Sequence, residues 1–368
     1  MNLLPTLSLV ALAIATTQAT DLPPSLSQAA SVPEAWRGQK ADLKPLLQFA
    51  DGRRVTEAAQ WPQRRAEILQ QWMELLGPWP ALLEHPVLRQ KERVPRNDGL
   101  LQIRVELQIA PQRFESGWLL QPDRQGPMPA VFVPFYEPET SIGTAGKPQR
   151  DFALQLARRG FVTLSIGSPG GDARKPLLCP ECSTQPLSYL GYISANAWQA
   201  LADLPQVDAK RIGIVGHSYG GKWSMFGACL SQRYAAAVWS DPGIAFDESR
   251  ASINYQEPWY LGLDAHITRK PGLVRADSPR TGAYKNLRQR GHDLHEVQAL
   301  MAPRPFLVSG GAEDPPKRWG LLNAVREVYS LLGADPQRVA MTNRPDHDPN
   351  PQSNQVIVDF FCHWLGRP

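Results

Sequence analysis

The sequence predicts an α/β fold with a mostly parallel central sheet, helices on both faces, and an insert over one end of the sheet. Short apolar runs alternate with helical stretches along most of the 368 residues, which is the pattern of βαβ units. Hydrophobic residues make up 42% of the chain and charged residues 20%, as in ordinary globular proteins. The length is sufficient for one large domain with a substantial core.

The strands of this fold are recognised by their apolar patterns. Polar and apolar residues alternate from Leu101 to Ile109, which predicts a half-exposed strand, and Ser116 to Leu120 is its predicted hairpin partner. Buried strands are predicted at 130–133, 161–166, 211–215, 235–239, 305–308 and 338–341. Helices are predicted around 61–76 and at 151–159, 189–204, 221–232, 317–332 and 354–364. Residues 242–300 interrupt the alternation and are predicted to be the insert.

The chain is expected to divide into three parts. Residues 1–19 resemble a signal peptide, because an apolar run precedes the small residues near Ala19, although the run has no Lys or Arg before it. Residues 20–100 are expected to form an N-terminal helical segment, and residues 101–368 the main domain with its insert. A signal peptide implies export, so we expect a periplasmic or secreted protein.

Composition argues against several classes of partner. The formal net charge is only +4 and the basic residues are scattered, so no nucleic-acid partner is expected. After the first 19 residues no apolar run approaches the ~18 residues that a membrane helix needs, so we expect no membrane association after signal removal.

Four cysteines allow several interpretations. Cys179 and Cys182 form a CxxC motif that suits a redox pair, half of a zinc site or a small disulfide loop. A second CxxC or a matching histidine pair is missing, so zinc is disfavoured and no metal or other cofactor is expected. Export favours the disulfide. Cys229 and Cys362 lie in apolar helical contexts, typical of buried thiols.

The most specific motif is Gly216-His217-Ser218-Tyr219-Gly220, which follows a predicted strand and opens a predicted helix. This is the context of a nucleophile elbow, a strained turn that exposes a serine hydroxyl above a sheet. The alternative is a glycine-rich turn without chemical consequence. We interpret Ser218 as a nucleophile.

A serine nucleophile needs a base and an acid, which follow it in this type of fold in the order Ser, Asp or Glu, His. Asp314 is predicted to be the acid because it lies in the turn after the strand at 305–308, and the neighbouring Glu313 is an alternative. His347 is predicted to be the base, since it lies between the last strand and the last helix. Among the other histidines, His217 is expected to point away from the nucleophile.

An oxyanion formed at Ser218 needs backbone donors. The N–H of Tyr219 is one candidate, and the second is expected in the loop after Val133. Pro134 has no N–H, so Phe135 or Tyr136 is the predicted donor, and the sequence does not separate them.

From Leu101 to Leu365 these motifs resemble the α/β-hydrolase superfamily. The N-terminal helical segment and strand pair are similar to carbohydrate esterases of the acetyl xylan esterase and dienelactone-hydrolase-like groups. The similarity to glucuronoyl esterases is partial. Those enzymes have Gly-Cys-Ser-Arg-x-Gly-Lys, of which Gly216, Ser218, Gly221 and Lys222 match. The resemblance implies that Lys222 reaches a sugar hydroxyl, unless it is a solvated surface lysine, and it raises Asp241, after the strand at 235–239, as a rival acid.

The resemblance and the triad predict a serine esterase that hydrolyses a carboxylic ester, on a carbohydrate, through an acyl-enzyme intermediate. Trp259 in the insert is a candidate substrate contact, with Asn254, Tyr255 and Tyr260 beside it. Packing of these aromatic residues as the core of a lid is the slightly preferred alternative. A serine peptidase of the prolyl-oligopeptidase type shares the triad but usually carries a propeller of repeated blades, which this sequence lacks. The third interpretation is a catalytically inactive binding protein with the same fold.

Overall fold

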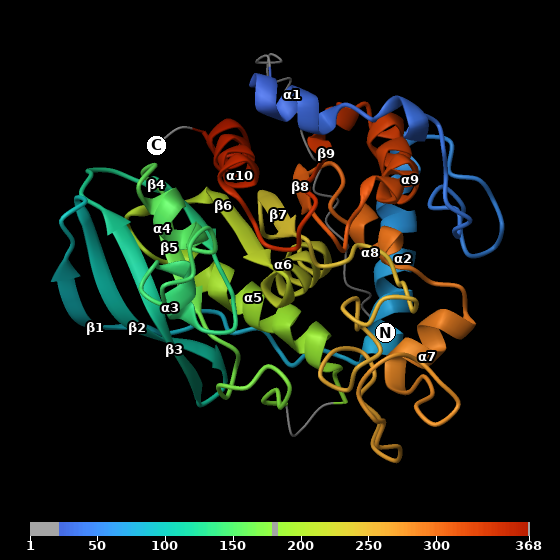
Figure 1. The fold of residues 1–368 in the computed structure, drawn as a ribbon, viewed down its shortest axis with the longest axis horizontal. Coiled ribbons are helices and arrows are strands. Elements are labelled where there is room, and N and C mark those ends of the chain that lie inside the picture. The colour runs from blue at the N-terminus through green and yellow to red at the C-terminus, as the bar shows by residue number, and fades with distance from the viewer. Residues whose placement is uncertain (1–21, 179–182, 367–368) are drawn as a thin grey trace, which may run out of the picture.

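The computed structural model describes residues 22–178 and 183–366 (Figure 1). The strands of these residues are β1 (Leu88–Pro95), β2 (Leu100–Ala110), β3 (Arg113–Pro122), β4 (Met128–Phe132), β5 (Val162–Ile166), β6 (Val207–His217), β7 (Ala236–Ser240), β8 (Phe306–Gly310) and β9 (Val339–Asn343). The α-helices are α1 (Pro24–Ala30), α2 (Trp61–Leu76), α3 (Pro138–Ser141), α4 (Phe152–Ala157), α5 (Pro186–Ala202), α6 (Tyr219–Leu230), α7 (Gly282–Gln289), α8 (Leu294–Ala299), α9 (Trp319–Leu331) and α10 (Pro351–Trp364). The 3₁₀ turns are η1 (Glu34–Trp36), η2 (Ala58–Gln60), η3 (Pro316–Arg318) and η4 (Pro336–Arg338).

The strands of the described residues form one nine-stranded sheet in the order β1-β2-β3-β5-β4-β6-β7-β8-β9. Strands β5, β4, β6, β7, β8 and β9 are parallel to one another, and β1, β2 and β3 extend the sheet as an antiparallel ribbon. In Figure 1 this ribbon lies at one end of the molecule, and α2, α7 and α9 lie at the other. The predicted α/β architecture is therefore confirmed.

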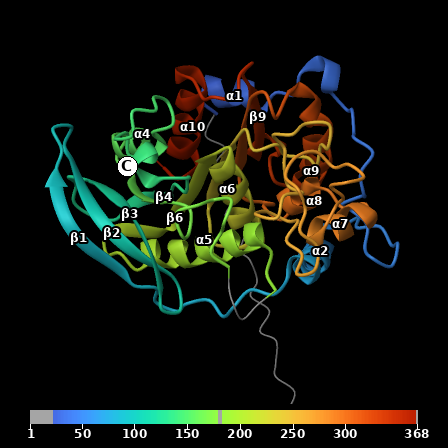
Figure 2. The ribbon, with the colours of Figure 1, turned by 60° about the horizontal axis from the view of Figure 1, so that its bottom comes forward.

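A hydrophobic core lies on each face of the sheet because alternate side chains of a strand point to opposite faces. In β7, Trp239 packs into the core that contains α2, α5, α6, α8 and α9, whereas Val238 packs into the core that contains α1, α4 and α10. Figure 2 shows these helices around the sheet. Both faces of the parallel strands are covered, which explains their continuous apolar runs.

The predicted strands and helices are found close to their predicted bounds. The main difference lies in residues 20–100, which were expected to be helical. They include the exposed edge strand β1, which pairs with β2. Charged residues dominate β1, and an edge strand exposed on most of its length tolerates them because it buries little of its surface.

The insert at 242–300 contains α7 and α8 and packs against the N-terminal segment. Glu296 of α8 accepts hydrogen bonds from Trp72 Nε1 of α2 (3.2 Å) and from the neighbouring His292 Nδ1 (2.7 Å). Arg65 of α2 donates to the carbonyl of Leu300. The N-terminal segment thus packs against the insert, and Figures 1 and 2 show α2 next to α7 and α8.

Some sequence predictions fall outside the described residues. The signal peptide and the Cys179–Cys182 pair both do so. Cys229 is buried, as predicted, and Cys362 is partly buried. Over residues 22–178 and 183–366, no helix is both long and apolar enough to cross a membrane, and no group of side chains suited to a metal ion is found.

The contact between β3 and β5 gives a test of the fold. A Cβ added at Gly117 of β3 would lie 2.2 Å from the carbonyl oxygen of Ser165 on β5. We therefore expect Gly117→Ala to lower the free energy of unfolding by about 1–3 kcal/mol, measured by urea denaturation. The control is Ser116→Ala, next to it on the exposed face, with an expected change within ~0.5 kcal/mol. Equal losses in the two variants would contradict this account of the contact.

Candidate active site

Ser218 lies in a strained turn between β6 and α6. Its backbone has φ +54° and ψ −111°, a region that costs a non-glycine residue free energy. The turn is held on both sides, since the N–H of Ser218 donates to the carbonyl of Ser240 (2.8 Å) and its carbonyl accepts from the N–H of Lys222 (2.9 Å). This is the geometry of the predicted nucleophile elbow.

The glycines of the motif are required by close contacts. A Cβ at Gly216 would lie 2.2 Å from the carbonyl oxygen of Gly220, and a Cβ at Gly220 would lie 2.3 Å from that of Pro134. The elbow therefore packs directly against the loop that follows β4. That loop is the predicted source of the second oxyanion donor.

The imidazole of His347 is paired with Asp241. His347 Nδ1 lies 2.7 Å from Asp241 Oδ2, and because an ionised carboxylate only accepts hydrogen bonds, Nδ1 carries the proton. The carboxylate of Asp241 is fully buried. Its Oδ1 accepts from the backbone N–H groups of Gly311 (2.7 Å), Asp314 (2.9 Å) and Glu313 (3.1 Å). The N–H of Glu313 also reaches Oδ2 (3.2 Å), so Oδ2 accepts from this N–H and from the imidazole.

In the structure His347 pairs with Asp241, and the predicted acid, Asp314, has other partners. The carboxylate of Asp314 accepts from the N–H groups of Gly243 (2.9 Å) and Ile244 (2.6 Å), in the turn after β7. The alternative, Glu313, pairs with Arg250 Nε at 3.0 Å. Because β7 and β8 are parallel neighbours, their carboxyl ends meet at one edge of the sheet, and chain order does not decide which acid reaches His347.

Asp241 and Asp314 form a reciprocal pair of carboxylates. Each accepts backbone N–H groups from the turn that carries the other, so each turn is held by a side chain of its neighbour. Burial raises the pKa of Asp314 to about 7, and the Asp241 carboxylate adds to the rise, whereas its backbone hydrogen bonds and Arg318 oppose it. Asp314 thus holds a proton over a pH range in which a solvated aspartate is ionised.

Arg344, which the sequence analysis did not single out, holds the loop of His347. Its buried guanidinium donates to the carbonyls of His347 (2.6 Å) and Asp348 (2.8 Å). It also donates to the carbonyl of Ser309 on β8 (2.7 Å) and to Ser240 Oγ on β7 (3.2 Å). A planar group with five N–H donors suits this task.

His217 was expected to point away from the nucleophile, and in the structure its ring lies beside that of His347. Its ring centroid lies 4.6 Å from that of His347, and its Nδ1 lies 3.2 Å from Ser240 Oγ. Burial lowers the pKa of His217 well below its ordinary value, and the neighbouring His347 and Arg344 lower it further. His217 is therefore neutral, and its uncharged ring packs beside that of His347.

The loop after β4 carries the candidate oxyanion donors. The N–H of Phe135 donates to the carbonyl of Ile166 (3.3 Å), so Tyr136 is the better candidate of the two. The Tyr136 ring stacks on that of Tyr219, with centroids 4.7 Å apart. Burial raises the pKa of the Tyr136 phenol above its ordinary value, against the opposing effects of Arg174 and Ser218. The phenol is therefore protonated at neutral pH and able to donate.

Lys222 is not a surface lysine. Its side chain is buried, Nζ donates to the carbonyl of Pro242 (2.7 Å), and Nζ lies 5.0 Å and 5.6 Å from the ring centroids of Tyr255 and Tyr260. Burial lowers the pKa of Lys222 to about 8, against the opposing effect of Asp314 and other carboxylates.

The aromatic residues of the insert were predicted either to contact substrate or to pack as the core of a lid, and the structure places them in two different environments. Tyr255 and Tyr260 are buried in the core, as expected for a packed lid. Trp259 is partly exposed, and the guanidinium of Arg174 lies over its ring at 5.8 Å. A contact with substrate therefore remains a prediction for Trp259.

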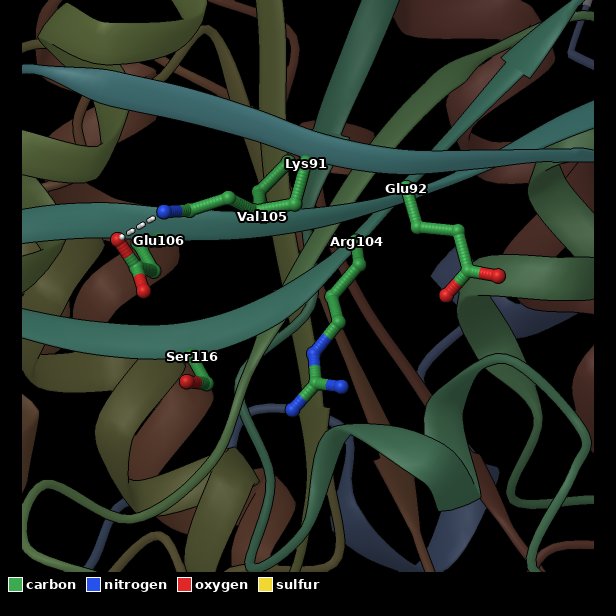
Figure 3. A pocket seen from close by; sticks show the side chains of 6 residues that line it. All are labelled: Lys91, Glu92, Arg104, Val105, Glu106 and Ser116. Carbon is green, nitrogen blue, oxygen red and sulfur yellow. Dashed lines mark ion pairs between the residues drawn. The ribbon is translucent and has the colours of Figure 1, made fainter.

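A hollow of about 300 Å³ lies elsewhere, on the antiparallel ribbon (Figure 3), and its lining residues are Lys91, Glu92, Arg104, Val105, Glu106 and Ser116. Charges of both signs line it, and Lys91 of β1 forms an ion pair with Glu106 of the neighbouring strand β2 (3.1 Å). In sheet order β5 and β4 separate this ribbon from β6 and Ser218. The hollow is therefore not part of the candidate active site.

Comparisons with known proteins agree with this geometry. A sequence profile of the prolyl oligopeptidase family matches residues 194–315. A 4-O-methyl-glucuronoyl methylesterase of Thermothelomyces thermophilus is 23% identical, over 89% of this chain and 83% of that protein. A glucuronoyl esterase from Solibacter usitatus has a TM-score of 0.69 at 16% identity, covering 90% of this chain and 98% of its own. The chain has the α/β-hydrolase fold. A putative acetyl xylan esterase from Bacteroides fragilis is also similar, with a TM-score of 0.56 at 17% identity, covering 89% of this chain and 84% of its own.

These comparisons confirm the predicted resemblance to carbohydrate esterases of the α/β-hydrolase type. They favour an esterase over the two alternatives, since relatives similar over most of the chain are esterases. The prolyl oligopeptidase profile spans only the region from α5 to the turn after β8, which contains the elbow.

The raised pKa of Asp314 predicts a pH dependence of stability. The ordinary pKa is 3.8 and the folded value is about 7, so between these values the folded state holds a proton that the unfolded state releases. Stability from this group is present below pH 3.8 and falls as the pH rises to about 7, by about 1.4 kcal/mol per pH unit. We expect Asp314→Asn to remove this slope when unfolding free energies are measured in urea from pH 4.5 to 6.5. Parallel pH profiles of the two proteins would contradict it.

Proposed function

We propose that the protein is a serine esterase that hydrolyses a carboxylic ester of a carbohydrate, with an ester of a uronic acid as the substrate class. The observation that carries the proposal is the pairing of His347 with the buried Asp241, with the His347 ring 4.6 Å from that of His217, the residue before the strained Ser218. This arrangement supplies a nucleophile, a base and an orienting acid in one place. Export to the periplasm or the medium is part of the proposal, because such esters occur on extracellular polysaccharides.

In the first half of the reaction Ser218 Oγ attacks the ester carbonyl carbon. His347 Nε2 takes the hydroxyl proton, and Asp241 stabilises the resulting imidazolium through Nδ1–H. The tetrahedral intermediate collapses when the C–O bond of the leaving alcohol breaks, and His347 returns the proton to that oxygen. The product of this half is an acyl-enzyme on Ser218.

In the second half a water molecule replaces the alcohol. His347 removes a proton from the water as it attacks the acyl carbon, and the proton then passes to Ser218 Oγ as the acid product leaves. In both halves the negative oxygen accepts from the N–H of Tyr219 and from Tyr136, through its N–H or its phenol. Tyr219 stands where glucuronoyl esterases have an arginine, so Tyr136 is proposed to supply the donor that the motif has lost.

The carbohydrate part of the proposal rests on the relatives and on two residues. Lys222 occupies the lysine position of the glucuronoyl-esterase motif, and its ammonium has donors beyond the one directed to Pro242. Trp259 offers a partly exposed indole ring of the kind that packs on sugar rings. We propose that Lys222 donates to a sugar hydroxyl and that Trp259 contacts the ring.

Three substrates separate the proposed function from its alternatives. We expect rapid hydrolysis of benzyl glucuronate, slower hydrolysis of p-nitrophenyl acetate, and no cleavage of a chromogenic prolyl peptide, measured as initial rates. Cleavage of the peptide alone would move the protein to the peptidases. Inactivity on all three, with Ser218→Ala unchanged in binding to glucuronate, would favour a binding protein.

The assignment of the triad predicts an order of effects. Ser218→Ala is expected to lower kcat by ~10⁴-fold or more, and Asp241→Asn by ~10²- to 10⁴-fold, because the amide favours the wrong tautomer of His347. Asp314→Asn is the matched control, since it makes the same chemical change in the partner carboxylate. Its expected loss is ~10-fold at most, because Asp314 orients a turn and not the imidazole. A larger loss in Asp314→Asn than in Asp241→Asn would restore Asp314 as the acid.

A further inference from the structure

Arg174 is an exposed arginine whose guanidinium lies over the ring of Trp259, 5.8 Å from the ring centroid. Arg174 belongs to the loop after β5 and Trp259 to the insert, so two segments distant in the chain meet here. Within residues 22–178 and 183–366 the Arg174 side chain has no hydrogen bond and no ion pair, whereas Arg150 pairs with Asp348. The described part of the protein therefore leaves the N–H groups of Arg174 unused.

The loop that carries Arg174 is fixed against the candidate active site. The N–H of Ser168 donates to the carbonyl of Tyr136 (3.0 Å), and the N–H of Gly171 donates to the carbonyl of Ser168 (2.8 Å). The carboxylate of Asp172 accepts from the backbone N–H of Arg174 (2.8 Å). The acid nearest to Arg174 in the sequence therefore binds the backbone of this turn.

A series of aromatic rings connects Arg174 to the nucleophile elbow. The ring centroid of Trp259 lies 6.3 Å from that of Tyr260, which lies 6.3 Å from that of Tyr219, the residue after the proposed nucleophile. Tyr219 stacks on Tyr136 at 4.7 Å. Tyr260 and Tyr219 are buried, whereas Trp259 is partly exposed and Tyr136 is 41% exposed. A carbohydrate can therefore contact the two outer rings, with Arg174 at the end of the series.

The chemistry of the guanidinium indicates the kind of group that it binds. Its contact with the indole is a cation–π interaction, and an aromatic face accepts no conventional hydrogen bond, so the five N–H donors stay available to a ligand. The fork of these donors matches the two oxygens of a carboxylate. In a polysaccharide of uronic acids that is only partly esterified, free carboxylates stand beside the remaining esters.

We propose that Arg174 is a specificity residue that binds a free carboxylate on the sugar next to the esterified uronic acid. The inference rests on the proposed esterase function and narrows its substrate class to a partly esterified polyuronate. Because Arg174 is exposed, its charge also attracts an anionic chain before contact.

Two disaccharides that differ in one charge test this proposal. In both, the first sugar is a uronic acid methyl ester. The second sugar is a free uronate in one disaccharide and the corresponding neutral hexose in the other. We expect the parent protein to have a kcat/KM about 5-fold higher for the anionic disaccharide, mainly through a lower KM, as for one exposed ion pair. Arg174→Gln is expected to lose this preference and to keep the kcat/KM for the neutral disaccharide within ~2-fold of the parent value.

Lys175→Gln is the matched control, because it removes the same charge from the next exposed residue of the loop. We expect it to keep the preference for the anionic disaccharide. Arg174→Lys is expected to keep only part of the preference, since an ammonium has the charge but not the fork. An increase of ionic strength from about 0.05 M to about 0.5 M should weaken the preference of the parent protein, because the charge is exposed.

Three outcomes would overturn the inference: equal kcat/KM for the two disaccharides in the parent protein, an unchanged preference in Arg174→Gln, or the same loss of preference in Lys175→Gln. An equal loss on both disaccharides in Arg174→Gln would also overturn it, since Arg174 would then only support Trp259. Failure of the proposed function is distinguished by the parent protein, which would then hydrolyse neither disaccharide nor benzyl glucuronate, and the inference would fail with it.

Discussion

The candidate site depends on an exchange of hydrogen bonds between the turns that follow β7 and β8. Asp241 binds the backbone of the second turn and Asp314 binds that of the first. Two buried carboxylates side by side repel each other, and five backbone N–H groups offset this cost. The exchange fixes Asp241 Oδ2 in front of His347, and Arg344 holds the loop of His347 through a hydrogen bond to its backbone carbonyl. Rigid support of this kind is what an orienting acid requires.

Burial of polar groups gives the site its electrostatic character. Lys222 has a pKa lowered to about 8 and Asp314 a pKa raised to about 7, both chiefly because the groups are removed from water. His217 is uncharged for the same reason. A charged neighbour in contact with His347 would compete with the imidazolium that forms during the reaction. The neutral ring of His217 avoids this repulsion while it fills the space beside the base.

The outer parts of the chain contribute to the site through the insert. The insert supplies Trp259 and Tyr260, and α8 anchors it to α2 through the hydrogen bond between Glu296 and Trp72. The N-terminal segment therefore supports the insert that carries Trp259 and Tyr260 and is not an independent unit.

The sequence alone determined the α/β fold and predicted the nucleophile elbow and the base, because each depends on local signals. Apolar runs define buried strands, glycines at 216 and 220 permit the close contacts of the elbow, and the position of His347 after the last strand predicts that it is the base. The partner of His347 was decided only by the tertiary structure. Asp241 and Asp314 follow neighbouring parallel strands, so both reach the same edge of the sheet. The backbone N–H groups that each one binds, which no spacing encodes, determine which oxygen faces the imidazole.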